Sequence, residues 1–163
     1  MYQATSKDIA VYFRRALAAG LCHNTDVEFW AARMIGQCAG EVPNWMLDLS
    51  VDPAANKERA LEAVPGESND GFVWKLMFAR LGRSFREGFL NTGQVIYLLL
   101  SWAVASTVPD EYRRAAYLFD DHHEGVGPGW FPEEELQKEI ATFFEQFRAY
   151  ESLLPTAPPN GSS

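Results

Sequence analysis

The spacing of apolar side chains constrains the fold of this chain more than any other feature of its sequence. In most segments apolar residues recur at i, i+3, i+4 and i+7, the period of one face of an α-helix. The clearest examples are residues 9–17 and 27–38. No alternating stretch is long enough to indicate a β-strand. The sequence therefore predicts an all-α protein.

Capping residues, prolines and glycines divide the chain into helices. In a capping box two residues three positions apart satisfy each other's free backbone N–H groups, a pattern present at Thr25 with Glu28 and at Asn91 with Gln94. Ser6 is the predicted N-cap of the first helix. We expect helices over residues 7–19, 25–40, 43–49, 52–64, 72–87, 92–106, 109–120 and from 132 onward.

These helices predict a single irregular bundle of about six to eight helices. The segment 95–104 is hydrophobic nearly all round, so we place it as the buried central helix. A length of 163 residues suits one domain, which we expect over 1–154. Residues 155–163 are rich in Pro, Gly and Ser, so we expect a disordered tail there.

The chain carries no sign of export, of a membrane span or of a cofactor. Its first seven residues are polar, and its longest apolar segment is about half of the ~20 residues that a membrane span needs. We expect Cys38 on an apolar helix face, and both Cys38 and Cys22 reduced. The glycines of 125–129 lack the ending of a phosphate-binding loop. We therefore expect a cytoplasmic protein without a cofactor.

The charge of the chain is acidic, with 22 Asp and Glu against 14 Lys and Arg and a net charge of −8. An acidic surface repels phosphate backbones, so nucleic acid is not an expected partner. It favours a basic protein partner and speeds that encounter. The alternative is that the acidity only keeps the protein in solution, and the sequence leaves both interpretations open.

The best candidates for chemistry are five consecutive residues: Asp120, Asp121, His122, His123 and Glu124. Carboxylates and imidazoles are ligands of zinc and iron, and Asp120, His122 and His123 are the candidate metal ligands. Ligands on a helix need a spacing of three or four residues, and the glycines at 125, 127 and 129 predict that the helix ends here instead. A solvated helix end and a metal or proton-transfer site remain the two interpretations.

Two further features have alternative interpretations. Trp130 and Phe131 either pack back on the core or form an exposed aromatic anchor for a partner. Arg80, Arg83 and Arg86 either make ion pairs on a solvated helix face or bind an acidic ligand. We take residues 120–124 together with Trp130 as the candidate partner-binding surface.

The first third of the chain resembles a group of known proteins. The residues that carry the resemblance are Ala-Gly-Leu at 19–21, VEFWAARMI at 27–35 and VPNWMLDLS at 42–50. They resemble small all-helical bacterial proteins of uncharacterised function, some of which are similar to immunity proteins of toxin–immunity systems. The resemblance implies binding to a toxin, and no catalytic residues.

Three functions follow from these features, and the sequence leaves all of them open. The first is a non-catalytic protein-binding domain, such as an acidic immunity-type inhibitor of a basic toxin. The second is a helical scaffold or homo-oligomer. The third is a metal-dependent enzyme that uses residues 120–124. We expect the first, and so a protein that is not an enzyme.

Overall fold

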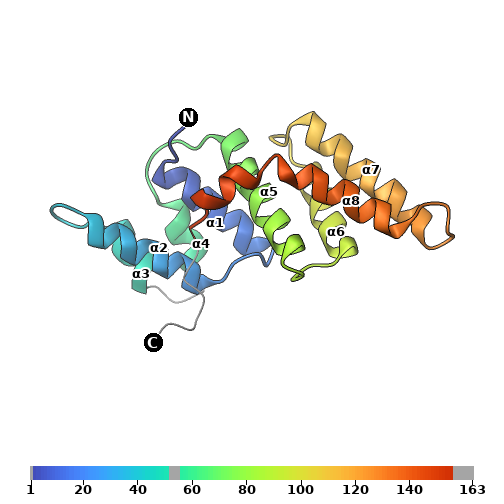
Figure 1. Ribbon diagram of the computed structural model, residues 1–163. Helices are drawn as coiled ribbons and strands as arrows, with labels where there is room; N and C mark the ends of the chain where they lie inside the picture. The colour runs from blue at the N-terminus through green and yellow to red at the C-terminus, as the bar shows by residue number, and fades with distance from the viewer. Residues whose placement is uncertain (1, 52–55, 156–163) are drawn as a thin grey trace. The chain divides into compact units, whose positions relative to one another are not determined.

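The computed structural model describes residues 2–51 and 56–155, and all the regular structure in these residues is helical (Figure 1). This confirms the predicted all-α class. The described residues form eight α-helices and one 3-10 helix: α1 (Ser6–Ala18), α2 (Asn24–Gln37), α3 (Asn44–Val51), α4 (Lys57–Glu62), α5 (Asp70–Arg86), α6 (Thr92–Ala103), α7 (Asp110–Val126), α8 (Glu133–Glu145) and η2 (Arg148–Leu153).

The chain divides into two compact units, which are described separately. Unit 1 comprises Met1–Asn69 and the chain from Leu154, and unit 2 comprises Asp70–Leu153. A single domain over 1–154 stays a prediction. Apart from Pro155, the tail expected at 155–163 lies outside the described residues, as do the expected helix-starting residues Asp52 and Pro53.

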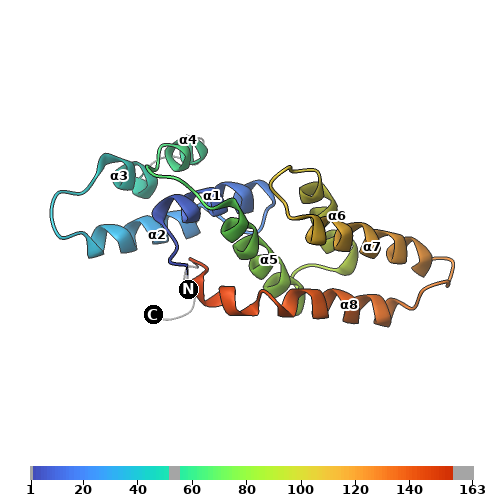
Figure 2. The same cartoon turned by 90° about the horizontal axis from the view of Figure 1, so that it is seen from above.

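Unit 1 contains α1 to α4. Figure 2 shows α3 and α4 alongside the pair formed by α1 and α2. The rings of Phe13 and Trp30 lie 5.4 Å apart and join α1 to α2. Leu49 of α3 and Leu61 of α4 are fully buried. Each helix therefore contributes an apolar face to one small core, as the helical spacing predicts.

The ends of the first two helices differ from the prediction. The N-cap of α1 is Thr5, not Ser6, because the Asp8 carboxylate accepts hydrogen bonds from the Thr5 N–H and hydroxyl (2.8 and 2.9 Å). The N-cap of α2 is His23, two residues before the predicted Thr25, because the carboxylate of Asp26 accepts a hydrogen bond from the N–H of His23 (2.8 Å). This helix ends at Gln37, so Cys38 is not on the helix: it has an extended backbone and is half-buried.

Unit 2 has its core along α5. Ten residues of α5 are buried, more than in any other described helix of the unit. Phe78 lies at the centre and contacts aromatic rings of α6, α7 and α8 and beyond, namely Trp102, Tyr112, Phe143 and Phe147. The prediction that 95–104 is the central helix is wrong, because Tyr97 of α6 and Val104, the residue that follows the helix, are 71% and 81% exposed.

Two of the three arginines of α5 make ion pairs, as one of the two interpretations predicts. Arg83 pairs with Glu87 (2.9 Å), and Arg86 binds both carboxylate oxygens of Glu151 (2.9 and 2.6 Å). Arg80 also has an interaction partner. Arg83 and Arg86 are therefore paired within unit 2 and offer little to an acidic ligand.

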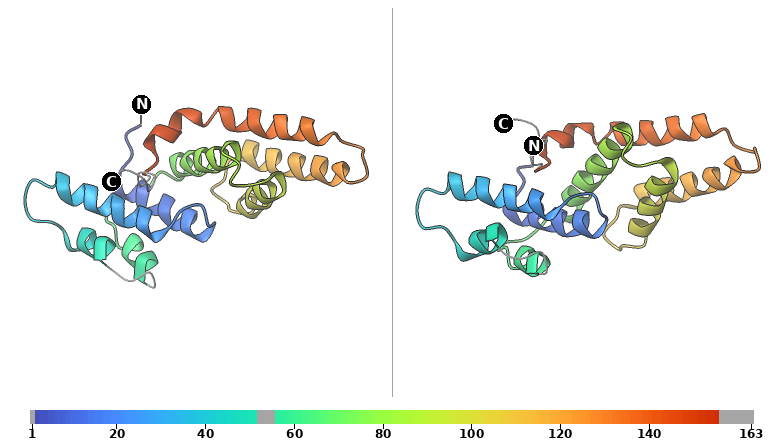
Figure 3. Two further views of the ribbon diagram at one scale, coloured as in Figure 1. Left: turned by 60° about the horizontal axis from the view of Figure 1, so that its bottom comes forward. Right: turned by 90° about the horizontal axis from the view of Figure 1, so that it is seen from below.

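α7 and α8 form a hairpin, seen side by side in both views of Figure 3. The glycines predict that α7 ends in the segment 120–129. The helix does end there, at Val126, but only after it has run through the Asp120–Glu124 cluster. Gly125 is buried inside the helix, where a Cβ would meet the Cβ of Phe131 at 3.2 Å. This glycine therefore serves close packing, not helix termination.

Candidate functional site

The negative charge of the chain is concentrated in the α7–α8 hairpin. Residues 120–139 comprise the end of α7, the connecting loop and the first half of α8, and we call them the acidic hairpin. They contain seven carboxylates and one lysine, a net charge of −6 out of −8 for the whole chain. The carboxylates belong to Asp120, Asp121, Glu124, Glu133, Glu134, Glu135 and Glu139.

The five consecutive candidate residues do not converge on one point, because the helix points them to different sides. His122 turns toward α8, where its Nδ1 lies 2.8 Å from Oε2 of Glu139 and its ring stacks on Phe131 at 3.9 Å. His123 turns toward α6, with Nε2 3.6 Å from the position that a Cβ on Gly93 would take. The two imidazole rings therefore lie in different environments, one against α8 and one against α6.

The acidic members of the cluster lie at the surface. Asp121 and Glu124 are exposed, and Asp120 is half-buried. Continuation of α7 does give Asp120 and Glu124 the i, i+4 spacing of helix-borne ligands. In the described part of the chain, however, no group of three or more His, Cys, Asp or Glu side chains is arranged to hold a metal ion. The metal hypothesis thus lacks a ligand set in residues 2–51 and 56–155.

The two aromatic residues of the loop, Trp130 and Phe131, lie in different positions, and each matches one of the two predicted alternatives. Phe131 is half-buried against His122, whereas Trp130 is 84% exposed. The carbonyl of Gly125 accepts from the N–H groups of both residues, at 2.8 and 3.1 Å, and Gly129 supplies the positive φ of 80° that the turn needs. The loop backbone is therefore bonded to the end of α7 while the indole faces solvent.

Other apolar side chains accompany Trp130 on the hairpin. Tyr117 and Leu118 of α7 are about half exposed. Leu118 and Phe143 border a shallow groove of about 480 Å³ between α7 and α8 whose other lining residues include Glu135 and Lys138. Apolar side chains beside charged ones are a common composition of binding surfaces.

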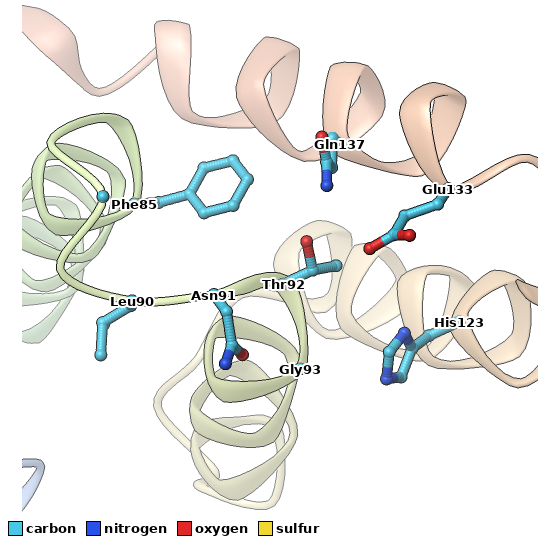
Figure 4. Close-up of a pocket in the computed structure, with 9 residues that line it drawn as sticks. Phe85, Leu90, Asn91, Thr92, Gly93, His123, Glu133 and Gln137 are labelled. Carbon is cyan, nitrogen blue, oxygen red and sulfur yellow. The ribbon is translucent and has the colours of Figure 1, made fainter.

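A pocket of about 670 Å³ lies beside the acidic hairpin, and the sequence did not indicate it. Figure 4 shows side chains from all four α-helices of unit 2 around it: Phe85 of α5, Thr92 of α6, His123 of α7, and Glu133 and Gln137 of α8. The only available signal was partial: the Asn91–Gln94 capping box fixes where α6 begins, and so places Thr92 at a helix start. Nothing in the spacing relates Phe85 to Glu133.

Comparison of the chain with family models, with curated proteins and with solved structures finds no match. Among the described residues, no helix is both long and apolar enough to cross a membrane.

Proposed function

We propose that the protein is a non-catalytic binding module for a basic protein, and that the acidic hairpin is its binding surface. The observation that carries this proposal is the 84% exposure of Trp130 in a loop flanked by seven carboxylates. A large aromatic side chain gains little from water and much from burial in a partner's pocket, and tryptophan is enriched among residues that dominate binding energy.

The charges of the hairpin favour a basic partner. Of its seven carboxylates, only that of Glu139 has an ion-pair partner among the described residues, and that partner is His122. Unpaired surface carboxylates set up a negative potential that speeds encounter with a positive surface and that salt weakens. Trp130 would then supply affinity and the carboxylates the rate and the selectivity.

The form of this function that we propose is an immunity-type inhibitor, which binds a basic toxin and covers its active surface. Support for it comes from the resemblance of segments 19–21, 27–35 and 42–50 to small immunity-like helical proteins. We propose the cytoplasm as the place of action, since Cys22 and Cys38 form no disulfide among the described residues.

The experiment begins with capture of the partner by the tagged full chain from a lysate of its native host at low salt. The expected result is one basic protein in equal amount, released at high salt. With the purified partner, Trp130→Ala should raise the Kd roughly 30-fold, the effect of losing a hot-spot residue. Tyr97→Ala is the matched control, because Tyr97 is 71% exposed on α6, outside the hairpin. A Kd unchanged by Trp130→Ala contradicts the proposal.

The charges are tested separately from the anchor. Asp121→Asn with Glu124→Gln should slow association and flatten its salt dependence, because both carboxylates are exposed on the hairpin. Glu41→Gln with Glu67→Gln removes the same charge from exposed positions of unit 1. If both double variants slow association equally, net charge alone is responsible and the hairpin is not the binding surface.

A further inference from the structure

The pocket beside the hairpin gathers hydrogen-bond acceptors that the protein leaves unused. Figure 4 shows the Thr92 hydroxyl, the Glu133 carboxylate and the Gln137 amide directed into the same space. No hydrogen bond or ion pair joins these three side chains to any described residue. By contrast, Glu87, Glu139 and Glu151 of the same unit each have a cationic or imidazole partner. The pocket therefore has capacity for a ligand.

The sign of the charge in this pocket favours a cation. Among the described residues, Glu133 is the only carboxylate that lines it, and no lysine or arginine does. The start of α6 also reaches the pocket, and a helix N-terminus by itself favours an anion. Here the side chains of Asn91 and Gln94 already accept from each other's backbone N–H groups (both 2.9 Å), and Glu133 repels an anion.

The remaining walls suit a flat cation. The Phe85 ring points into the pocket from the end of α5, and an aromatic face attracts a guanidinium. Glu133 and Gln137 stand one turn apart on α8, so a carboxylate and a side-chain amide lie side by side at the pocket. Guanidinium is planar and carries five N–H donors, whereas the lysine ammonium is a compact, strongly hydrated charge. The mixture of several acceptors with a ring matches arginine better.

We propose that this pocket binds the side chain of an arginine presented by the basic partner. The inference rests on the proposed function and deepens it, since it names the residue of the partner and its place of contact. Glu133 pairs with the guanidinium, the Thr92 hydroxyl accepts a further hydrogen bond, and Phe85 covers one face. The Gln137 amide, turned so that its carbonyl oxygen faces the ligand, accepts another. His123 also borders the pocket.

The test uses the ¹⁵N-labelled full chain and N-acetyl-arginine N-methylamide as the probe, followed by NMR. We expect saturable shifts of the Thr92 and Gly93 backbone amides and of the Gln137 side-chain amide. The citrulline counterpart has the same shape without the charge and should not bind. Glu133→Gln should weaken binding roughly tenfold, since it removes a hydrogen-bonded charge pair. Glu111→Gln, at an exposed first-turn position of α7 that lies outside the acidic hairpin and does not line the pocket, should leave the affinity unchanged.

Several results would overturn the proposal: no saturable shift, equal binding of the citrulline probe, equal loss in Glu111→Gln and Glu133→Gln, or inorganic phosphate shifting the same amides in place of arginine. Trp130→Ala separates this proposal from the proposed function, because Trp130 does not line the pocket. If it abolishes partner binding while wild type ignores the arginine probe, only the pocket proposal fails. If arginine binds as expected but hairpin variants leave partner binding intact, only the proposed function fails.

Discussion

Gly82 stands at a close approach of α5 and α8, and replacing it by alanine tests that packing. A Cβ on Gly82 would lie 2.7 Å from Cβ and 2.8 Å from Cγ of Phe144. Carbon atoms pack at about 3.5–4.0 Å, so the two helices would have to separate locally by roughly 1 Å. Because the nearest atom is the Cβ of Phe144, a change of rotamer does not relieve the contact. The backbone of α8 itself must move.

The expected net effect of Gly82→Ala is a loss of about 1–2 kcal/mol. Alanine gains about 1 kcal/mol over glycine within a helix. Overpacking of a well-filled core typically costs about 1–3 kcal/mol, and the stiffness of this contact places it in the upper part of that range. The buried residues Leu136, Ile140 and Phe144 all lie on α8, so a shift of this helix disturbs its whole apolar face.

The matched control is Gly36→Ala. Gly36 lies in α2, and no atom would lie within 4 Å of its added Cβ, so this variant should gain up to about 1 kcal/mol from helix propensity alone. Urea denaturation followed by circular dichroism measures both changes, and hydrogen exchange reports them separately for α2 and for α5 with α8. If Gly82→Ala is stabilised as much as Gly36→Ala, the close approach of α5 and α8 is refuted.

Two further predictions concern buried charges of unit 1. Burial raises the pKa of the Asp8 carboxyl, but hydrogen bonds from the N–H groups of Thr5 and Asn69, and from the hydroxyls of Tyr2 and Thr5, lower the pKa below its usual value overall. Its contribution to stability is therefore complete above about pH 4 and is lost as the pH falls through the lowered pKa. Asp8→Asn should cost about 1.5–3 kcal/mol at neutral pH and lose less stability on acidification than wild type, as denaturation at several pH values will show. Lys57 is 1% exposed, donates a hydrogen bond to the Leu49 carbonyl (2.7 Å) and lies 3.3 Å from the carboxylate of Glu28. In urea denaturation, Lys57→Met should therefore lower the free energy of unfolding by about 1–3 kcal/mol. Glu28→Gln should lower it less, because Glu28 is 43% exposed. Equal losses in these last two variants would mean that the ion pair, not the bond to Leu49, matters.

The helices were predictable from the sequence because their signals are local. The period of the apolar residues predicted α1, α2, α7 and α8, and the Asn91–Gln94 box predicted the start of α6. Errors arose where two local signals compete. Between His23 and Glu28 several polar residues have the spacing of a capping box, and the shorter side chain of Asp26 forms it. Only the geometry of the folded turn decides between them.

Glycine and apolar composition misled where tertiary contacts decide. The sequence pattern predicts that Gly125 terminates a helix, yet it lies inside α7, where Phe131 packs against it. The apolar stretch 95–104 predicts a buried centre, yet Tyr97 of α6 and Val104, just after the helix, are exposed. Composition gives the amount of apolar surface, but not the number of neighbours available to cover it. The pocket could not be predicted from the sequence for the same reason, since its lining residues come from four helices.

The stability of the acidic hairpin bears on whether its charges are there for binding. Glu124 lies in the last turn of α7, where the helix dipole disfavours a negative charge, and it stands at i+3 from Asp121 and i+4 from Asp120. Each of these terms costs a few tenths of a kcal/mol, so Asp121→Asn with Glu124→Gln should stabilise unit 2 by about 0.5–1 kcal/mol. The same variant is expected to slow association with the partner. If the double variant is more stable but associates more slowly, the two carboxylates destabilise the fold and favour binding, as expected of residues selected for binding. A variant that loses stability would instead assign these carboxylates to the fold, and would remove them from the binding surface.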